Sequence, residues 1–321
     1  MFKTGIYSLE NLISGRSLKT LFGDDKDISI TLYDKIQGLD NADNLAEKIL
    51  LLFKDDRGVY KRTYAKRFEE FDLKLLEYFK NYLKPKFDLN NNLVIFDVGV
   101  SDARTSLDLF EKLTVKFKNI KYIASDYNNL VYIINKNQTN ITVDPNGKIL
   151  EILWPPFVFN KIRLNRFLFL YPLNHIIKFF VYILIALPLV KAYKNGKLSG
   201  KKLVLFAPYA LDKALGDPRF VLKQHNLLQP FNEAQPANFI RAMNVLNPSY
   251  FSGHQLKIII KNLYFGLKED GLLVVGSNQD ADSLVDGAIY KKTNYGFKLL
   301  EKFGKGFINS SLIEDFGKRI F

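Results

Sequence analysis

Apolar and polar positions along the chain predict strands that alternate with helices. The run Leu93 to Phe96 ends in Asp97, small residues follow, and Ser106 to Leu113 then has apolar positions at helical spacing. A short apolar run bounded by a turn is typical of a strand buried in a parallel sheet. A second strand, Lys121 to Asp126, also ends in an acidic residue. These two strands predict an α/β chain with a doubly wound sheet.

The second half of the chain continues this pattern. Three apolar runs predict the remaining parallel strands: Phe220 to Lys223, Phe239 to Met243 and Leu272 to Gly276. A helix is expected from Gly253 to Leu267, and two further runs predict a closing antiparallel hairpin: Ala288 to Asn294 and Gly296 to Lys302. We therefore expect a Rossmann-like, seven-stranded, mostly parallel sheet with an antiparallel C-terminal hairpin.

The first ninety residues look mainly helical, with apolar periodicity over Asp43 to Phe53 and Arg67 to Leu83. We expect residues 1–90 to form a helical N-terminal cap. Residues 91–321 would then form the Rossmann-like domain, with an inserted hairpin and apolar segment at 141–202. The basic residues Lys61, Arg62, Lys66 and Arg67 suit either a phosphate contact or a solvated helix face.

The insert begins after Asp126. A helix is expected over Tyr127 to Asn135, and a hairpin over Ile141 to Leu153, where Asp144-Pro-Asn-Gly147 is a strong turn signal. Phe167 to Val190 then forms a segment of twenty-four residues with one lysine and no acidic residue. A continuous helix of this length would span about 36 Å, enough for a bilayer core.

Several features argue against a single membrane span in this segment. The chain must return to the same sheet, and five residues are expected to interrupt the helix: Pro172, Asn174, His175, Lys178 and Pro188. Basic residues flank the segment on both sides: Lys161, Arg163, Arg166, Lys191 and Lys194. An element lying in the plane of an anionic membrane surface fits this pattern. The alternative is a hydrophobic lid folded over its own domain.

The loop after the first strand has small residues at Gly99, Ser101 and Ala103, which would allow close approach of a ligand to the backbone. Asp126 stands where an acidic residue would hydrogen-bond a ribose. The stretch Asp97 to Ala103 resembles the acidic-x-Gly-x-Gly-x-Gly loop of the class I S-adenosylmethionine-dependent methyltransferases. Ser101 and Ala103 replace two of its glycines.

Later blocks are similar to the chemotaxis-receptor (CheR-type) branch of that family: Phe220 to Leu228, Ala237 to Leu246 and Leu267 to Gly276. The resemblance implies S-adenosyl-L-methionine as cofactor and places a polar side chain near its adenine, for which Asn226 is the candidate. The implied cofactor-binding residues are Asp97, Gly99, Val100, Ser101, Thr105, Asp126, Tyr127, Asn226, Leu227 and Met243.

Methyl transfer needs an aligned acceptor more than it needs a base, because the sulfonium already carries an activated methyl group. If a base exists, His254 is better placed than His225, although a surface residue at a helix start is the plainer interpretation. Arg241, Asn244 and Tyr250 are the other candidate catalytic residues, and they would orient an acceptor near the edge of the sheet.

Composition limits the remaining choices. The 321 residues are 47% hydrophobic, contain no cysteine and only three histidines, and carry a net charge of +13. Disulfides are excluded and a zinc site is not expected. The first thirty residues lack a signal-peptide pattern, so we expect a cytoplasmic protein, with peripheral contact at the inner membrane surface if the apolar segment lies on lipid. The charge favours anionic partners, or reflects a lysine-rich composition.

Three hypotheses about function follow. The first is a methyltransferase that acts on a lipid-like or membrane-proximal small molecule. The second is an RNA methyltransferase, which the positive charge favours although nucleic acid is the less favoured partner. The third is a non-catalytic cofactor-binding or scaffold protein. The sequence leaves the oligomeric state open.

Overall fold

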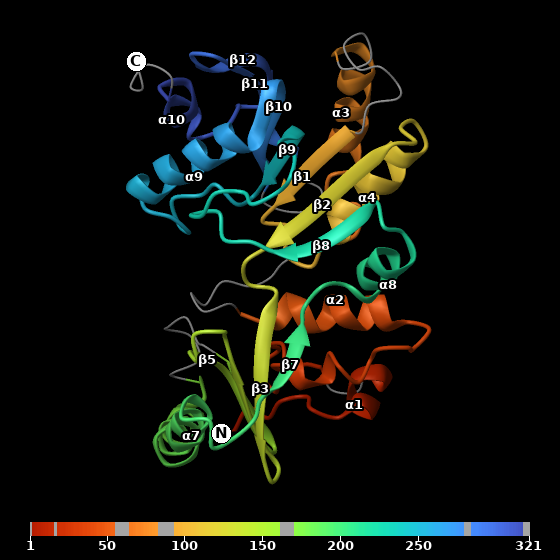
Figure 1. The fold of residues 1–321 in the computed structure, drawn as a ribbon. Helices are drawn as coiled ribbons and strands as arrows, with labels where there is room; N and C mark the ends of the chain where they lie inside the picture. The colour runs from red at the N-terminus through yellow and green to blue at the C-terminus, as the bar shows by residue number, and fades with distance from the viewer. Residues whose placement is uncertain are drawn as a thin grey trace. The chain divides into compact units, whose positions relative to one another are not determined.

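The computed structural model describes residues 2–15, 18–54, 64–82, 93–160, 170–278 and 284–316, without the side chains of 80–82. The chain divides into two compact units, each built from two separate stretches (Figure 1). Unit 1 comprises Met1–Thr63 and Asn128–Pro208. Unit 2 comprises Tyr64–Tyr127 and Tyr209–Phe321.

Unit 2 contains the predicted seven-stranded sheet, in the order β12-β11-β10-β9-β1-β2-β8. The strands β8, β2, β1, β9 and β10 pair in parallel, and β10, β11 and β12 pair antiparallel. Their bounds are β1 (Leu93–Val98), β2 (Ile120–Asp126), β8 (Phe220–Gln224), β9 (Ala237–Met243), β10 (Leu267–Ser277), β11 (Asp286–Thr293) and β12 (Gly296–Phe303). The Rossmann-like α/β fold is confirmed.

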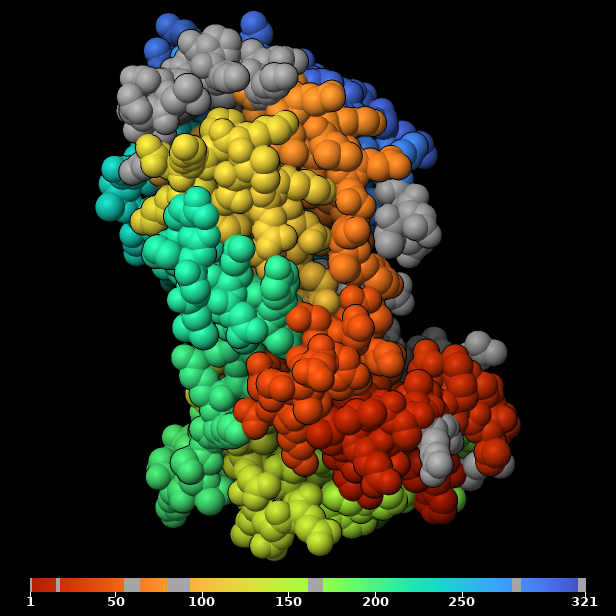
Figure 2. All heavy atoms as spheres, turned by 90° about the vertical axis from the view of Figure 1, so that its right-hand side faces the viewer, coloured from red at the N-terminus to blue at the C-terminus, as the bar shows by residue number. Residues whose placement is uncertain are grey.

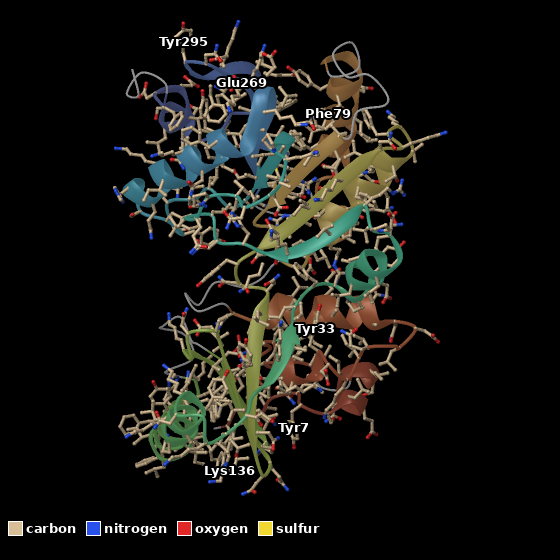
Figure 3. All side chains as sticks on the ribbon, in the orientation of Figure 1. Tyr7, Tyr33, Phe79, Lys136, Glu269 and Tyr295 are labelled. Atoms are coloured by element: carbon tan, nitrogen blue, oxygen red, sulfur yellow. The ribbon has the colours of Figure 1, made fainter. Side chains whose placement is uncertain are left out.

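Helices accompany this sheet: α3 (Glu69–Tyr82), α4 (Arg104–Thr114), α8 (Pro208–Gly216), α9 (Gly253–Gly266) and α10 (Ser310–Glu314). The predicted helix after the fourth strand is confirmed as α9, which starts with a reciprocal capping box between Ser252 and Gln255. On α3, Phe79, which Figure 3 labels, lies edge-on against Phe239 of β9, with ring centroids 4.5 Å apart. Helix α3 therefore belongs to the unit of the parallel sheet.

Unit 1 is built around a five-stranded antiparallel sheet in the order β6-β5-β4-β3-β7. The bounds are β3 (Leu130–Lys136), β4 (Thr139–Val143), β5 (Ile149–Trp154), β6 (Phe157–Asn160) and β7 (Lys201–Val204). The predicted hairpin around Asp144 to Gly147 is confirmed as β4 and β5. The predicted helix over Tyr127 to Asn135 is wrong, because its β-branched run pairs with β4 and β7 as strand β3.

The N-terminal stretch covers one face of this second sheet. It contributes α1 (Leu9–Ser14), the 3₁₀ turn η1 (Ile30–Leu32) and α2 (Ala42–Leu52). Their apolar side chains pack with Val131, Ile133 and Leu203 of the sheet. Figure 2 shows these N-terminal residues, in red and orange, beside the yellow-green strands. The expected cap of residues 1–90 is thus divided: 1–63 belong with 128–208, and 64–90 with the parallel sheet.

The other face of the second sheet is covered by one continuous helix, Pro172–Lys194, which we call the apolar helix (Figure 1). It consists of α6 (Pro172–Val181), the π-helical turn η2 (Tyr182–Ala186) and α7 (Leu187–Lys194). The expected interruption by prolines is wrong. Pro172 occupies the first turn, where no donor is needed, and Pro188 follows the π turn, in which Leu187 N–H already bonds Tyr182 O.

The apolar helix is long and apolar enough to cross a membrane by length and composition, and 22% of its most apolar window is buried. The first part of the predicted apolar segment, Phe167 to Phe169, and the flanking Lys161, Arg163 and Arg166 lie outside the described residues. So do Lys61 and Arg62 of the basic cluster.

Candidate cofactor site at the carboxyl edge of the parallel sheet

The candidate residues of unit 2 follow the carboxyl ends of neighbouring parallel strands. The loops after β1, β2, β8, β9 and β10 all leave the same edge, because these five strands pair in parallel. Open α/β sheets bind their ligands outside this edge. The fold therefore brings the sequence-predicted residues to one side of the sheet.

The loop between β1 and α4 has three left-handed positions in alternation. The backbone dihedral φ is +70° at Gly99, +57° at Ser101 and +65° at Ala103. These are the three positions at which the sequence placed small residues. Glycine adopts this conformation freely, whereas an L-residue pays about 1–2 kcal/mol. Ser101 and Ala103 therefore hold strained backbone in the loop that opens α4.

Gly99 is needed for contact within the protein. A Cβ atom added there would lie 2.5 Å from the Cβ of Val245, which follows β9. Gly99 N–H also donates to Ser125 O at 2.8 Å. Glycine at this position is therefore explained by the close approach of Val245, and contact of Gly99 with a cofactor stays a prediction.

Ser101 connects the loop to the acidic end of β2. Its N–H donates to Asp126 Oδ2 at 2.8 Å, and its hydroxyl oxygen is buried with no hydrogen-bond partner. Asp126 is half-buried. Because the carboxylate is only partly buried, hydrogen-bond donors of a ligand can reach it. The structure thus brings together two of the predicted cofactor-binding residues, Ser101 and Asp126, and the hydroxyl of Ser101 is buried without a partner.

Asp97 has a different role from the one expected. It is buried, it accepts a hydrogen bond from Tyr122 Oη at 2.7 Å, and it forms an ion pair with Arg241 Nε at 3.2 Å. Both carboxylate oxygens therefore bind protein groups in the interior. The prediction of Asp97 as a direct cofactor ligand is corrected to a structural role.

Arg241 is the centre of this buried network. Its side chain is 1% exposed, its Nη1 lies 2.8 Å from Asp72 Oδ1, and its Nη2 donates to Thr105 O at 3.1 Å. Arg241 thus connects β9 to β1, α3 and α4. The prediction that it orients an acceptor is wrong, because its guanidinium is enclosed by these partners.

The carboxylates of Asp72 and Asp97 share this one guanidinium, and burial is the largest influence on the pKa values of Asp72 and Tyr122. Burial raises the pKa of Asp72 to about 7, against the attraction of Arg241. Burial and the neighbouring Asp97 raise the pKa of the Tyr122 hydroxyl. The carboxylates raise the pKa of Arg241, although burial opposes this, so the guanidinium stays charged.

Sequence reasoning missed Asp72. The signal was its position on α3, since Asp72 lies on the same helical stripe as Phe68, Leu75 and Phe79, which are all buried. An acidic residue within an apolar stripe requires a buried cation. Arg241, in the mostly apolar strand β9, is that cation.

The loop after β8 lies next to Asp126. His225 N–H donates to Asp126 O at 3.2 Å, and its ring stacks on Phe231 with centroids 4.6 Å apart. Its Nε2 is buried without a partner, and burial lowers its pKa. Asn226 Oδ1 accepts from Leu228 N–H at 3.0 Å, as a turn residue does, and Leu227 is buried in the core. Sequence reasoning gave His225 no role of its own.

On the expected acceptor side, Asn244 follows β9 directly and has φ +57°. Its side-chain Nδ2 donates to Asn278 Oδ1 at 3.0 Å, and its Oδ1 accepts from the backbone N–H of Asn278 at 2.9 Å. Arg67 Nε donates to the same Asn278 oxygen at 3.0 Å. Sequence reasoning proposed neither Asn278 nor a link from it to Arg67. Asn244 is therefore held in a fixed position at the edge.

The remaining predicted residues are less closely tied to this edge. His254 is exposed in the first turn of α9, Tyr250 is half-buried, and Tyr127 is exposed. Val100, Thr105 and Met243 are buried, and Met243 packs against Gly276 of β10. Among the described residues, no group of three or more His, Asp or Glu could hold a metal ion.

No protein-family model and no curated protein match the chain. Among solved structures, it is similar to the N-methyltransferase NodS from Bradyrhizobium japonicum WM9 in complex with S-adenosyl-L-homocysteine, at 15% identity and a TM-score of 0.33, over 75% of this chain and 76% of that chain. It is also similar to the DszA carbon methyltransferase, at 12% identity and a TM-score of 0.32, over 66% of this chain and 36% of that chain.

A third similar structure is the CMeT domain of the citrinin polyketide synthase, at 14% identity and a TM-score of 0.31, over 64% of this chain and 35% of that chain. The matched region thus spans about a third of the length of these last two proteins. At such TM-scores the likeness is remote, and it carries no conclusion about what the chain does.

Proposed function

We propose that the chain is an S-adenosylmethionine-dependent methyltransferase whose cofactor binds at the carboxyl edge of β1 and β2. The observation that carries the proposal is the β1–α4 loop, in which three left-handed residues bring Ser101 N–H onto the carboxylate of Asp126. A strained loop at the opening of a helix, beside the acidic end of the next strand, suits a nucleoside ligand.

The residues at this edge fit such a cofactor in part. Asp126 is half-buried and can accept hydrogen bonds from ribose hydroxyls, while the Ser101 hydroxyl is a buried polar atom in need of a partner. His225 and Asn226 follow β8 on the adenine side that the sequence resemblance implies. Asp97 does not fit as a ligand, because Arg241 and Tyr122 occupy its oxygens. The CheR-type branch stays a prediction.

The cofactor would supply an activated methyl group, so the chain's own task is to align the acceptor and exclude water. Asn244, fixed by Asn278 and Arg67, is the best-supported residue for orienting an acceptor. His254 is exposed, which favours an acceptor that needs no base, such as a carboxylate. We propose a lipid-like or membrane-proximal small molecule as the acceptor class, and the apolar helix of unit 1 supports this choice.

The distribution of charge weighs against an RNA acceptor. Residues 128–208 contain eleven Lys and Arg but only two Asp and Glu, so they account for +9 of the total +13. The unit with the parallel sheet therefore carries only a small part of the positive charge. A second candidate is a cofactor-binding protein without turnover, which the exposure of His254 favours, since no buried base stands at this edge among the predicted catalytic residues.

Calorimetry with S-adenosylmethionine tests the proposal. Asp126→Ala should weaken binding about tenfold or more, since hydrogen bonds to a charged group contribute about 1.5–3 kcal/mol. Asp126→Asn keeps an acceptor for Ser101 N–H, so it separates loop support from ligand contact. Asp217→Ala is the matched control, because Asp217 precedes β8 at the opposite end of that strand.

Failure of the wild-type chain to bind S-adenosylmethionine would remove both the enzyme and the cofactor-binding hypotheses. Unchanged affinity in Asp126→Ala would mean that the site lies elsewhere. Transfer of labelled methyl groups to a lipid extract, and not to protein or RNA, separates the proposed acceptor class from its rivals. Binding without transfer to any of the three supports the non-catalytic candidate.

A further inference from the structure

The apolar helix has one face buried and the other exposed. Val181, Ala186, Leu189 and Val190 are buried, and they pack on the face of the antiparallel sheet formed by Ile134, Ile141, Ile152, Phe157 and their neighbours. Ile177 and Tyr193, near the two ends of this contact, also pack there. The helix therefore lies along the sheet for about 24 Å of its length.

The opposite face is an apolar stripe. Leu173, Ile176, Phe180, Ile183, Leu184 and Leu187 follow one another mostly at intervals of three or four residues, and each is between 41% and 68% exposed. Phe179 lies beside this stripe and is 59% exposed. A continuous exposed stripe of large apolar residues marks an interaction surface.

The charge around this stripe indicates what covers it. The exposed Lys191, Lys194 and Lys197 lie at the end of the helix, within the stretch 128–208 that carries +9. Two copies of the chain that met through this face would bring like charges together. An anionic lipid surface would instead gain about 1 kcal/mol for each nearby Lys or Arg.

We propose that the exposed stripe of the apolar helix docks into the headgroup region of an anionic bilayer, with the helix axis parallel to the membrane plane. A spanning orientation would require separating the helix from the sheet, and it would leave Val143, Ile152 and Phe159 uncovered. The chain also leaves from β6 and returns to β7 of the same sheet. The docking does not depend on methyl transfer, since the stripe belongs to unit 1.

Vesicle sedimentation of the full chain is the first test. The protein should sediment with vesicles of equal parts phosphatidylglycerol and phosphatidylcholine, less at high salt, and weakly with phosphatidylcholine alone. Phe180→Glu together with Leu184→Glu should lower the affinity at least about tenfold. Lys191→Gln and Lys194→Gln should each lower it about fivefold. All four side chains are exposed, so these variants should fold.

Phe265→Glu is the matched control. Phe265 lies on α9 of unit 2 and is 61% exposed, similar to the residues of the stripe. This variant should bind vesicles as the wild-type chain does. Equal losses for Phe265→Glu and for the stripe variants would overturn the proposal, as would sedimentation that depends on neither lipid charge nor the stripe.

The absence of cysteine allows a second test, of orientation. Leu173→Cys, Phe180→Cys and Leu187→Cys, each labelled with a polarity-sensitive fluorophore, span about 21 Å of helix. In-plane docking predicts the same shallow depth for all three labels when quenchers at known bilayer depths are used, and no response from Phe265→Cys. Depths that increase steadily from 173 to 187 would indicate a span and contradict the proposal.

Two outcomes would assign the stripe to another partner. If the protein does not bind vesicles but forms concentration-dependent dimers, and Phe180→Glu dissociates these dimers, the partner of the stripe is a second copy of the chain. Protection of the labels from aqueous quenchers without lipid would identify a lid. S-adenosylmethionine binding, measured in the same variants, should stay unchanged, so a failure of docking is distinguishable from a failure of the proposed function.

Discussion

Ala103 holds a left-handed conformation that an alanine adopts only at a cost. The sequence has small residues in this loop, and we expected them to matter. At Ser101 and Ala103 the structure explains their small size by the left-handed backbone conformation. The partner of Gly99 could not be predicted, because Val245 lies almost 150 residues away and approaches only through the pairing of β1 with β9. The orphan Ser101 hydroxyl likewise emerges only from the folded loop.

Ala103→Gly should raise the free energy of unfolding by up to about 1 kcal/mol, because it relieves the left-handed strain at a smaller entropic cost. Gly99→Ala should lower it by more than about 1 kcal/mol, since a Cβ would overlap Val245. Urea unfolding measures both. Ala210→Gly, inside α8, is the control and should lose about 1 kcal/mol. A loss of stability in Ala103→Gly would contradict the strain interpretation.

Glu151 predicts a pH dependence of stability. It is fully buried on β5, accepts from Ser29 Oγ at 2.6 Å and from Ile30 N–H, and burial raises its pKa from 4.5 to about 7. Since the folded state holds a proton that the unfolded chain has released, this stability is full below pH 4.5 and is lost as the pH rises to 7.

Glu151→Gln should remove this loss. Between pH 5 and pH 8 the wild-type chain should lose more free energy of unfolding than the variant, by up to about 3 kcal/mol. Asp72, whose pKa is also raised, changes the free energy of unfolding with pH equally in both proteins, so its contribution cancels in the comparison. Identical slopes for the two proteins would show that Glu151 is ionised in the folded state throughout this range.

At the scale of elements, the strands of the parallel sheet were predictable because each is a short, mostly apolar run bounded by turns. Strand β3 was not, since Leu130 to Asn135 is short and apolar enough to suit a helix, and only its pairing with β4 and β7 decides. The continuity of the apolar helix was hidden by Pro188, which the π turn accommodates. Strand pairing depends on residues far apart in the sequence, and the π turn is a change of hydrogen-bond register within one helix. The periodicity of apolar residues reveals neither.

Arg241 predicts how firmly α3 is attached to the sheet. Arg241→Ala leaves Asp72 of α3 and Asp97 of β1 buried without their cation, so it should lower the free energy of unfolding by about 3–5 kcal/mol. Thermal unfolding at pH 8, above the pKa of about 7 that burial gives Asp72, shows the largest effect. Arg219→Ala is the control, because its pair with Asp217 is partly exposed and should contribute at most about 1 kcal/mol. A stable Arg241→Ala protein would restore the acceptor-orienting role.

At the scale of the whole molecule, the sequence predicted the parallel sheet but placed the boundary wrongly at residue 90. The reason is that the helices of residues 1–53 find their apolar partners on β3, β5 and β7, beyond residue 129. The chain leaves unit 2 after Tyr127 and returns at Tyr209. The two connecting segments run side by side, since Leu130 pairs with Val204 and Leu205 N–H donates to Asn129 O at 2.7 Å.

This geometry predicts that unit 2 can be produced alone. A chain that starts at residue 64, with residues 128–208 replaced by a short Gly/Ser linker, should fold cooperatively, because the chain leaves and returns through paired segments, with Asn129 bonded to Leu205. Circular dichroism through thermal unfolding checks the fold, and calorimetry should give the S-adenosylmethionine affinity of the full chain. A product without a cooperative transition would show that unit 2 depends on unit 1.

The interleaving of the two units also has a consequence during synthesis. Residues 1–63 are synthesised before the sheet that covers Leu45, Ile49 and Phe53, which is complete only after residue 204 has followed. At ~5–20 residues per second, the intervening 140 or so residues take roughly 7–30 s to translate. For that time the apolar face of the preceding helices stays uncovered. A ribosome-bound chaperone that engages amphipathic helices would have its longest opportunity here, and slow codons before residue 204 would prolong it.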